Sequence, residues 1–255
     1  MSNKREREKR REEREAEEAR VDTTDRRKQL LQLGAGAVFL VVVVVVVLII
    51  VQASSSESGG DTKLEEISTV NKLFTGIPQE ELVLGDPKAP VSLYEYGDLQ
   101  CPICKSYSES VLPPIIEGKI KRGEVKLEFR NFMIIGEQSL PAGMAALAAG
   151  AQGRGWNYLE LFYRNQGVEN SGYVTDEFME AIAKGAGIKD LAKWNKERKE
   201  KKYEEEANKT TKEAQTFGFT GTPSFAVKGP GSKGLELLGS PGSTAAIEEA
   251  IKEAE

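Results

Sequence analysis

Residues 91–104 read VSLYEYGDLQCPIC and contain the only two cysteines of the 255-residue sequence, Cys101 and Cys104. The apolar start of this segment favours a short strand, and the residues after Cys101 favour a helix. Two cysteines three positions apart at the start of a helix can close a small disulfide ring. The pair therefore indicates either redox chemistry or a structural disulfide, and the compartment in which it lies bears on the choice.

A second feature is the uninterrupted apolar run of residues 33–51, which includes seven consecutive valines. As a helix, these nineteen residues extend about 28 Å, close to the thickness of the hydrocarbon core of a bilayer. Residues 26–28, which read RRK, precede the run, whereas residues 52–62 contain no basic side chain. Because basic residues stay on the cytoplasmic side, we expect a single-pass signal anchor over residues 29–52 in the cell membrane, with a cytoplasmic N-terminus and an exported domain.

A cleaved signal peptide is the alternative interpretation of this run. Residues 51–53, which read VQA, offer small side chains at the spacing that cleavage requires. However, the apolar run is longer than the about 7–15 residues usual in signal peptides, and a long charged region precedes it. In both interpretations the cysteines lie beyond the membrane, where disulfides persist, which points to thiol-disulfide chemistry on secreted proteins.

The rest of the chain divides into a tail, a linker and one domain. Residues 1–28 contain eleven basic and nine acidic residues in interleaved order, so we expect a solvated cytoplasmic tail that binds no nucleic acid. Residues 53–81 begin with a run rich in serine and glycine, and we expect them to form an extracytoplasmic linker. Residues 82–255 suffice for one domain with its own core.

The first half of this domain has the pattern strand, helix, strand. Strands are predicted over residues 91–96 and 125–130, the second from strict alternation of apolar and charged side chains. Every fourth position of the helix between them is apolar, which predicts a buried face made by Ile103, Tyr107, Val111 and Ile115. Two consecutive prolines, Pro113 and Pro114, predict a kink or a restart. This order favours a right-handed parallel crossover.

Helical signals dominate the middle of the domain, over about residues 139–217. The elements expected from here on are helices over residues 141–152, 156–166 and 175–187, with Thr175 as an N-cap, one solvated helix within residues 190–212, strands over residues 222–227 and 235–238, and a final helix capped by Ser243 or Thr244. This is the order of a thioredoxin fold, an α/β fold, with an inserted helical domain. The anchor adds a single transmembrane helix before it.

Five short motifs follow one another along this domain: GDP at 85–87, YEYGD at 94–98, CPIC at 101–104, RNF at 130–132 and GTPSF at 221–225. Together they resemble the DsbA family of thiol-disulfide oxidoreductases, and most of all its membrane-anchored forms from bacteria with little or no periplasm. The resemblance covers residues 82–255. A CxxC motif alone is a moderate signal, whereas CPxC after a strand with a Gly-Thr-Pro about 120 residues later is a specific one.

Thiol chemistry explains why the cysteines stand at a helix start. The thiolate is the attacking and leaving form, and unpaired N–H groups at a helix N-terminus stabilise its charge. Pro102 suits the first helical position, where an N–H has no partner. We therefore predict that Cys101 is the nucleophile and that Cys104 resolves the mixed disulfide. A pKa lowered from about 8.5 to about 5.5 would stabilise the thiolate by roughly 4 kcal/mol.

The resemblance assigns roles to three further residues. Glu95 lies where thioredoxin-like proteins place a buried carboxylate, which implies that it relays a proton to or from Cys104; an exposed strand carboxylate is the alternative. The resemblance also implies a cis bond between Thr222 and Pro223 beside the disulfide, with the backbone of Thr222 binding an extended substrate peptide. An ordinary trans turn is the alternative there.

Ile103 stands where the best-known member of the family has a histidine, and the chain contains no histidine at all. A cationic or hydrogen-bonding contribution from that position is therefore missing, and we expect a milder oxidant. The absence of histidine also excludes Cys/His protease chemistry and histidine-based zinc sites. We expect no metal and no organic cofactor besides the Cys101–Cys104 disulfide.

These features predict an extracytoplasmic oxidoreductase that donates disulfides to unfolded or reduced secreted proteins. The resemblance implies reoxidation by a quinone-linked membrane protein of the DsbB or vitamin-K-epoxide-reductase type. Two alternatives stay open: a disulfide reductase or isomerase with a reducing partner, and a noncatalytic, membrane-tethered peptide-binding module with a structural disulfide. A structural disulfide should leave both sulfurs buried, whereas a catalytic one should expose Cys101 and make it acidic.

Overall fold

Residues 63–255 are the part of the chain that the computed structural model describes. The predicted tail (residues 1–28) and the predicted anchor (residues 29–52) lie outside the described residues, and both stay predictions. Among residues 63–255, no helix has both the length and the apolar character needed to cross a bilayer.

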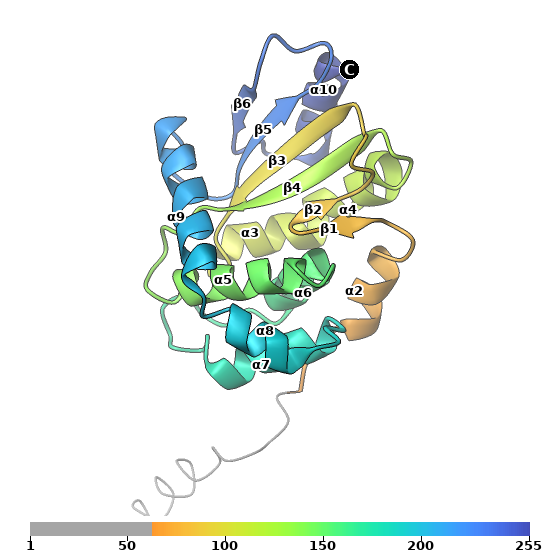
Figure 1. Ribbon diagram of the computed structural model, residues 1–255. Coiled ribbons are helices and arrows are strands. Elements are labelled where there is room, and N and C mark those ends of the chain that lie inside the picture. The colour runs from red at the N-terminus through yellow and green to blue at the C-terminus, as the bar shows by residue number, and fades with distance from the viewer. Residues whose placement is uncertain (1–62) are drawn as a thin grey trace, which may run out of the picture. The chain divides into compact units, whose positions relative to one another are not determined.

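A mixed six-stranded sheet forms the centre of the domain, in the order β1-β2-β4-β3-β5-β6 (Figure 1). Its strands are β1 (Gln79–Glu80), β2 (Val83–Leu84), β3 (Val91–Gly97), β4 (Val125–Asn131), β5 (Ser224–Lys228) and β6 (Glu236–Gly239). The predicted parallel crossover is confirmed, because β3 and β4 are parallel neighbours with Val91 opposite Val125. In β4, buried and half-buried residues alternate, as its sequence predicts. Strand β3 lies between β4 and β5, and this central position buries most of its residues.

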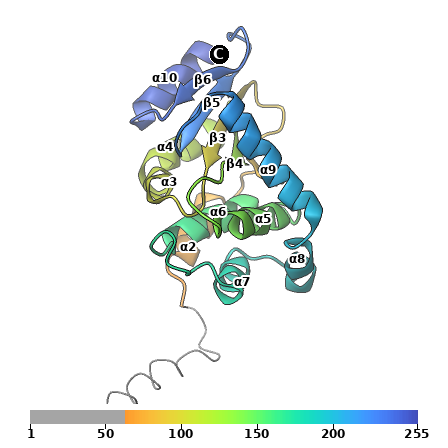
Figure 2. The same cartoon turned by 90° about the vertical axis from the view of Figure 1, so that its left-hand side faces the viewer.

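Helices cover both faces of this sheet. They are α2 (Ile67–Leu73), α3 (Pro102–Ser106), η1 (Tyr107–Val111), α4 (Leu112–Ile115), η2 (Ile116–Ile120), α5 (Ser139–Gly150), α6 (Gly155–Arg164), α7 (Asp176–Gly185), α8 (Leu191–Glu197), α9 (Lys201–Thr216) and α10 (Thr244–Ala254). Helices α4 and α10 pack together on one side of β3 and β5, and α9 lies against β4 on the other (Figure 2). Helices α5 to α9 follow β4 and precede β5, which confirms the thioredoxin fold with a helical insertion.

The buried face predicted for the first helix is only partly right. Ile115 is fully buried and Tyr107 and Val111 are half-buried against the core, but Ile103 is 55% exposed. The row that is buried throughout lies one residue further along the chain and consists of Cys104, Ser108, Leu112, Ile116 and Ile120. The helix contains two π-helical turns, η1 and η2, on either side of the prolines of α4. A π-helical turn is wider than an α-helical turn, so every fourth residue returns to the same face over four turns. The cysteine and serine in this buried row are not apolar enough to have revealed it.

The charged segment after α7 also differs from its prediction, because it forms two helices rather than one. Trp194 on α8 is fully buried, and its indole N–H donates to the carbonyl of Ala145 at 3.0 Å. Arg198, just after α8, is buried as well and pairs with Asp176 at 2.8 Å. The chain turns at this point because one face of α8 packs into the insertion, and α9 then starts in a new direction.

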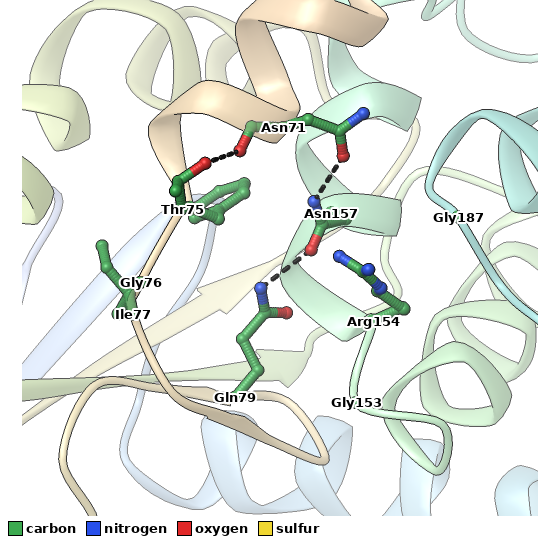
Figure 3. A pocket seen from close by; sticks show the side chains of 10 residues that line it. Asn71, Thr75, Gly76, Ile77, Gln79, Gly153, Arg154, Asn157 and Gly187 are labelled. Atoms are coloured by element: carbon green, nitrogen blue, oxygen red, sulfur yellow. Dashed lines mark hydrogen bonds between the residues drawn. The ribbon is translucent and has the colours of Figure 1, made fainter.

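The folded domain starts before residue 82, so the predicted linker of residues 53–81 is too long at its C-terminal end. Helix α2 and strand β1 both precede that residue, and Val70, Phe74 and Ile77 are buried in the core. Hydrogen bonds between amide side chains join this segment to α6: Asn157 donates to Asn71 at 3.1 Å, and Gln79 donates to Asn157 at 2.8 Å (Figure 3). The serine- and glycine-rich composition therefore predicts a linker only for the residues that have this composition, and not for the segment up to residue 81.

Helix α9 is attached to the sheet through Arg130 of β4. Its guanidinium lies 4.5 Å from the ring centroid of Tyr94 and pairs with Glu128 at 2.9 Å and with Glu213 of α9 at 2.5 Å. The hydroxyl of Tyr96 also donates to Glu213, at 3.1 Å. These contacts hold the last helix of the insertion against the two central strands.

We predict that Gly97→Ala destabilises the domain by about 1–3 kcal/mol, because overpacking a filled core costs that much. A Cβ atom at Gly97 would lie 2.6 Å from the ring of Phe129 and 3.1 Å from the hydroxyl of Tyr163. Urea unfolding of purified residues 63–255 measures the change. Gly234→Ala is the matched control, since a Cβ atom there meets nothing within 4 Å. Equal effects of the two substitutions would contradict the close approach of α6 to β3.

Candidate active site

Cys101 is the N-cap residue of α3, as the sequence predicts. Its backbone is extended, with φ −75° and ψ 119°, and its sulfur accepts a hydrogen bond from the N–H of Cys104 at 3.4 Å. Pro102 occupies the first turn of the helix, where a missing N–H costs nothing. The N–H groups at this end of α3 therefore point toward the sulfur and favour its anionic form.

Asp98 fixes the loop that carries Cys101. Its carboxylate is 1% exposed and accepts three backbone hydrogen bonds, from Gln100 at 2.9 Å, Ile134 at 2.9 Å and Ile135 at 3.0 Å. The end of β3 is thereby joined to the segment after β4. The sequence identifies Asp98 only as a turn residue, because nothing in it shows that residues 134 and 135 would present their N–H groups here.

The helical insertion holds the same loop from the other side. Gln166 donates to the carbonyls of Leu99 at 2.7 Å and Cys101 at 3.2 Å. Gln100 is buried; it donates to Ser139 at 3.0 Å and accepts from the N–H of Asn170 at 3.1 Å. None of these amide contacts is predicted by the sequence, since amide side chains in a helical insertion carry no distinguishing pattern.

The two cysteines differ sharply in acidity. The hydrogen bond from the Cys104 thiol is the main cause that lowers the pKa of Cys101, which falls to about 6, with burial opposing and Thr222 and backbone N–H groups adding to it. Burial, and then the Cys101 sulfur, raise the pKa of Cys104 well above its usual value. At neutral pH the site thus pairs a thiolate with a thiol, the arrangement that thiol-disulfide exchange requires.

The accessibility of Cys101 departs from expectation. Cys104 is fully buried, but Cys101 is also only 3% exposed, whereas the sequence analysis expects an exposed nucleophile. The sulfur of Cys101 contacts the carbonyl of Thr222 at 3.3 Å, and the following bond to Pro223 is cis, just before β5. The criterion of acidity for a catalytic cysteine is therefore met, and the criterion of exposure is not met in this state.

Glu95 is a buried carboxyl, not an exposed strand residue. It is 1% exposed on the central strand β3, and its Oε1 has no hydrogen-bond partner among residues 63–255. Burial is the main cause that raises its pKa to about 8, followed by the charges of Glu160 and Cys101. At neutral pH it is mostly a neutral acid that can give up a proton.

Apolar side chains lie exposed on segments next to this site. Ile103 is 55% exposed, Ile134 is 42% exposed and Val168 is 76% exposed. The segments that carry Ile134 and Val168 are both tied to the loop before Cys101, by the bonds of Asp98 and of Asn170 described above. Large exposed apolar side chains that gather near a reactive group are typical of a binding surface for polypeptide.

The cavity of about 510 Å³ shown in Figure 3 lies elsewhere, between α2, β1 and the start of α6. Its lining is mostly amide, glycine and apolar side chains together with Arg154, and it includes neither cysteine. Among residues 63–255, no cluster of three or more acidic or cysteine side chains is arranged to hold a metal ion. The cysteines and Glu95 are therefore the candidate chemical groups of this site.

We predict that Cys104→Ala raises the pKa of Cys101 from about 6 toward its ordinary value, because the largest stabilising hydrogen bond to the sulfur is lost. Cys104→Ser should raise it less, since its hydroxyl can still donate. Ultraviolet absorbance of the thiolate against pH measures both shifts. Identical shifts in the two variants would mean that the hydrogen bond from residue 104 does not set the acidity of Cys101.

Glu95→Gln should stabilise the domain at alkaline pH. With its pKa raised to about 8, Glu95 stays protonated in the folded state while the unfolded chain ionises. The resulting loss in the free energy of unfolding is absent at acidic pH and grows as pH rises through the pKa of Glu95 in the unfolded chain. It levels off above about pH 8 at no more than about 5 kcal/mol. Thermal unfolding of both proteins from pH 4 to 9 measures this. Glu249→Gln on the exposed side of α10 is the control, and a pH-independent difference for Glu95→Gln would contradict the raised pKa.

Comparisons with known proteins agree with the fold and the site. The thioredoxin family model matches residues 78–252. A probable disulfide bond formation protein D of Bacillus cereus is 32% identical over 162 residues, which cover 62% of this chain and 74% of the relative. Similar solved structures include oxidised BdbD of Bacillus subtilis, with 22% identity, a TM-score of 0.60 and coverage of 70% of this chain and 97% of that one. Another is α-DsbA1 of Wolbachia pipientis, with 23% identity, a TM-score of 0.58 and coverage of 72% and 95%.

At these identities the solved structures establish the fold alone, whereas the family model and the Bacillus cereus relative establish descent. Both bear out the resemblance found in the sequence motifs. The chain belongs to the thioredoxin family, among its DsbA-like disulfide bond formation proteins, and is a thiol-disulfide oxidoreductase.

Proposed function

We propose that this protein donates disulfides to secreted or cell-surface proteins outside the cytoplasm, through Cys101 and Cys104. The observation that carries the proposal is the opposite perturbation of the two thiols, which lowers the pKa of Cys101 to about 6 and raises that of Cys104. Stabilising one thiolate stabilises the reduced pair, and that makes the corresponding disulfide a stronger oxidant. At pH 7 about nine in ten Cys101 thiols are ionised in the reduced protein.

The proposed reaction begins when a client thiolate attacks the sulfur of Cys101 in the oxidised protein. The bond between Cys101 and Cys104 breaks, a mixed disulfide with the client forms, and Cys104 leaves with the electron pair and takes a proton from Glu95. A second client thiolate then attacks the client sulfur and releases Cys101 as a thiolate. The client loses two electrons and gains a disulfide, and the enzyme pair gains both electrons.

Client binding is proposed to use the backbone next to Pro223 and the exposed apolar side chains. The carbonyl of Thr222 lies 3.3 Å from the sulfur of Cys101, so a peptide paired with this backbone would present its own sulfur nearby. Ile103, Ile134 and Val168 would contact apolar side chains that an unfolded client exposes. Pro102 supports the site by fixing the first turn of α3.

A membrane partner is proposed to restore the disulfide. By resemblance to the family, this is a quinone-linked protein of the DsbB or vitamin-K-epoxide-reductase type, which takes the two electrons from Cys101 and Cys104. The anchor over residues 29–52 would keep the domain in the same membrane, with residues 1–28 in the cytoplasm. The apolar run and the basic residues before it support this topology.

Net reduction or isomerisation of client disulfides is the second candidate function. Ile103 supports it, because an aliphatic side chain between the cysteines supplies no charge or hydrogen bond to the thiolate, which favours a milder oxidant. A noncatalytic module has one observation in its favour, the 3% exposure of Cys101. Against it stands the low pKa of Cys101, which a purely structural cysteine does not need.

Cys104→Ser in cells should accumulate mixed disulfides between Cys101 and exported proteins, because residue 104 can no longer attack the mixed disulfide and a captured client can leave only through its own second thiol. Cys101→Ser is the matched control and should trap none. Glutathione titration of the purified domain should give a reduction potential between about −120 and −200 mV, the range of disulfide donors. Trapping of a reducing membrane protein alone, with a potential below about −250 mV, would favour the reductase. No trapping and no exchange with glutathione would leave a structural disulfide.

A further inference from the structure

Glu160 on α6 is a buried acid that the proposed reaction does not use. Its side chain is 3% exposed, inside the helical insertion rather than in the thioredoxin fold itself. The hydroxyl of Ser108 donates to its Oε2 at 2.5 Å, and Arg164 pairs with its Oε1 at 2.7 Å. A carboxyl taken out of water is costly unless it is paired, and these two partners hold Glu160 in a fixed position.

Helix spacing connects Glu160 to the cysteines through Ser108. Ser108 follows Cys104 by four residues in the row that the π-helical turn keeps on one buried face. Lys105 also reaches α6, where its ammonium donates to the carbonyls of Tyr163 and Arg164 at 2.9 and 3.2 Å. The helix that starts at Cys101 therefore packs directly against the face of α6 that carries Glu160.

Strand spacing connects the same face of α6 to Glu95. Tyr163 lies one helical turn after Glu160, and its hydroxyl donates to the carbonyl of Asp98 at 3.3 Å. That hydroxyl lies 3.1 Å from the position of a Cβ atom on Gly97. Gly97 and Glu95 are two residues apart in β3 and so face the same side of the sheet. Glu95 and Glu160 are therefore directed into one buried space between β3, α3 and α6.

The charges around the two acids are unequal. Burial raises the pKa of Glu160, with a small contribution from Glu109, while the hydrogen bond from Ser108 and the charge of Arg164 counter that rise and favour the ionised form. Glu95 faces the sulfurs of Cys101 and Cys104, the hydroxyl of Tyr163 and the carboxylate of Glu160, with no cation among the causes that shift it. When two buried acids interact, the one without a cation beside it is the one that stays protonated to higher pH.

We infer that Glu160 is a positioning residue whose negative charge, held by Ser108 and Arg164, adds to the effect of burial and helps to keep Glu95 protonated between turnovers, so that a proton is ready for the departing Cys104 sulfur. This inference rests on the proposed function, in which Glu95 supplies that proton. The helical insertion would then take part in the chemistry of the thioredoxin fold, because the charge that favours protonation of Glu95 lies on α6. Glu160 itself touches no reacting atom.

Glu160→Gln tests the inference, because it removes the charge and keeps the size of the side chain. Carbon NMR of labelled glutamate carboxyls follows the titration of Glu95, identified by the signal that Glu95→Gln removes. We expect the pKa of Glu95 to fall by about one unit in Glu160→Gln. The titration of Cys101 should stay where it is, since Glu160 is not among the causes that shift it. An unchanged pKa of Glu95 would overturn the inference.

Glu66→Gln is the matched control, because Glu66 pairs with the opposite side of Arg164 at 3.2 Å but is largely exposed. It should leave the titration of Glu95 unaltered, and Glu160→Asp should restore most of the shift. If Glu160→Gln does not fold, Ser108→Ala replaces it. Loss of the Ser108 hydroxyl weakens the charged form of Glu160, so the pKa of Glu95 should again fall; no fall in that variant would overturn the inference.

The titration separates this inference from the proposed function, since it needs no client and no membrane partner. A domain that fails to oxidise clients but shows the expected shift of Glu95 would sink the proposed function and keep the electrostatic coupling. A domain that oxidises clients but shows no change in the pKa of Glu95 in Glu160→Gln would keep the proposed function and overturn the inference. Coupling to catalysis then appears as a client-oxidation rate whose alkaline limit moves to lower pH in Glu160→Gln and not in Glu66→Gln.

Discussion

The stabilisation of one negative charge, on the sulfur of Cys101, is the interaction on which the rest of this domain depends. The pKa of Cys101 is lowered because the N–H groups at the start of α3, the thiol of Cys104 and the side chain of Thr222 meet around one atom. These groups come from parts of the chain more than a hundred residues apart, so their meeting must be fixed by the fold. Asp98 and Gln166 hold the loop that carries Cys101, the first from the end of β3 and the second from the helical insertion.

This arrangement places two glutamates in the interior of the domain, which lowers its stability. Glu95 and Glu160 are both almost fully buried, and only Glu160 has a cation beside it. Buried carboxyls of this kind reduce the free energy of unfolding, and such costs are typical of functional sites. The insertion offsets part of the cost by large aromatic burial, as at Trp194 and Phe162, and by the contacts of Arg130 with α9. The packing of the insertion thus compensates in part for the buried carboxyls near the cysteines.

The sequence predicts the parallel crossover of β3 and β4, the helical insertion and the position of Cys101 at a helix start, because these follow from local patterns and from motifs of fixed spacing, and the family resemblance adds the burial of Glu95. It does not predict strands β1 and β2, which have two residues each. It does not predict the buried row of the first helix, since π-helical turns leave no mark in a list of apolar residues. Asp98, Gln166 and Glu160 also escape it. Their partners lie far away in the chain, and single polar residues in helices and turns have no pattern that distinguishes a buried contact from a solvated one. The sequence also predicts too late a start for the domain, because α2 is short and mostly polar and therefore gives a weak helical signal.

The cover over Cys101 has a consequence for the chemical lifetime of the protein. A cysteine that is ionised at neutral pH is the form that peroxides attack, and the product ladder ends in acids that no thiol can reverse. Susceptibility rises with exposure as well as with ionisation, and here the ionised side chain is only 3% exposed. Small diffusing oxidants therefore meet a shielded atom. Under the proposed function, a polypeptide bound along Thr222 would bring its own sulfur beside Cys101. The cover that hides the sulfur would then make its reactivity conditional on a bound chain.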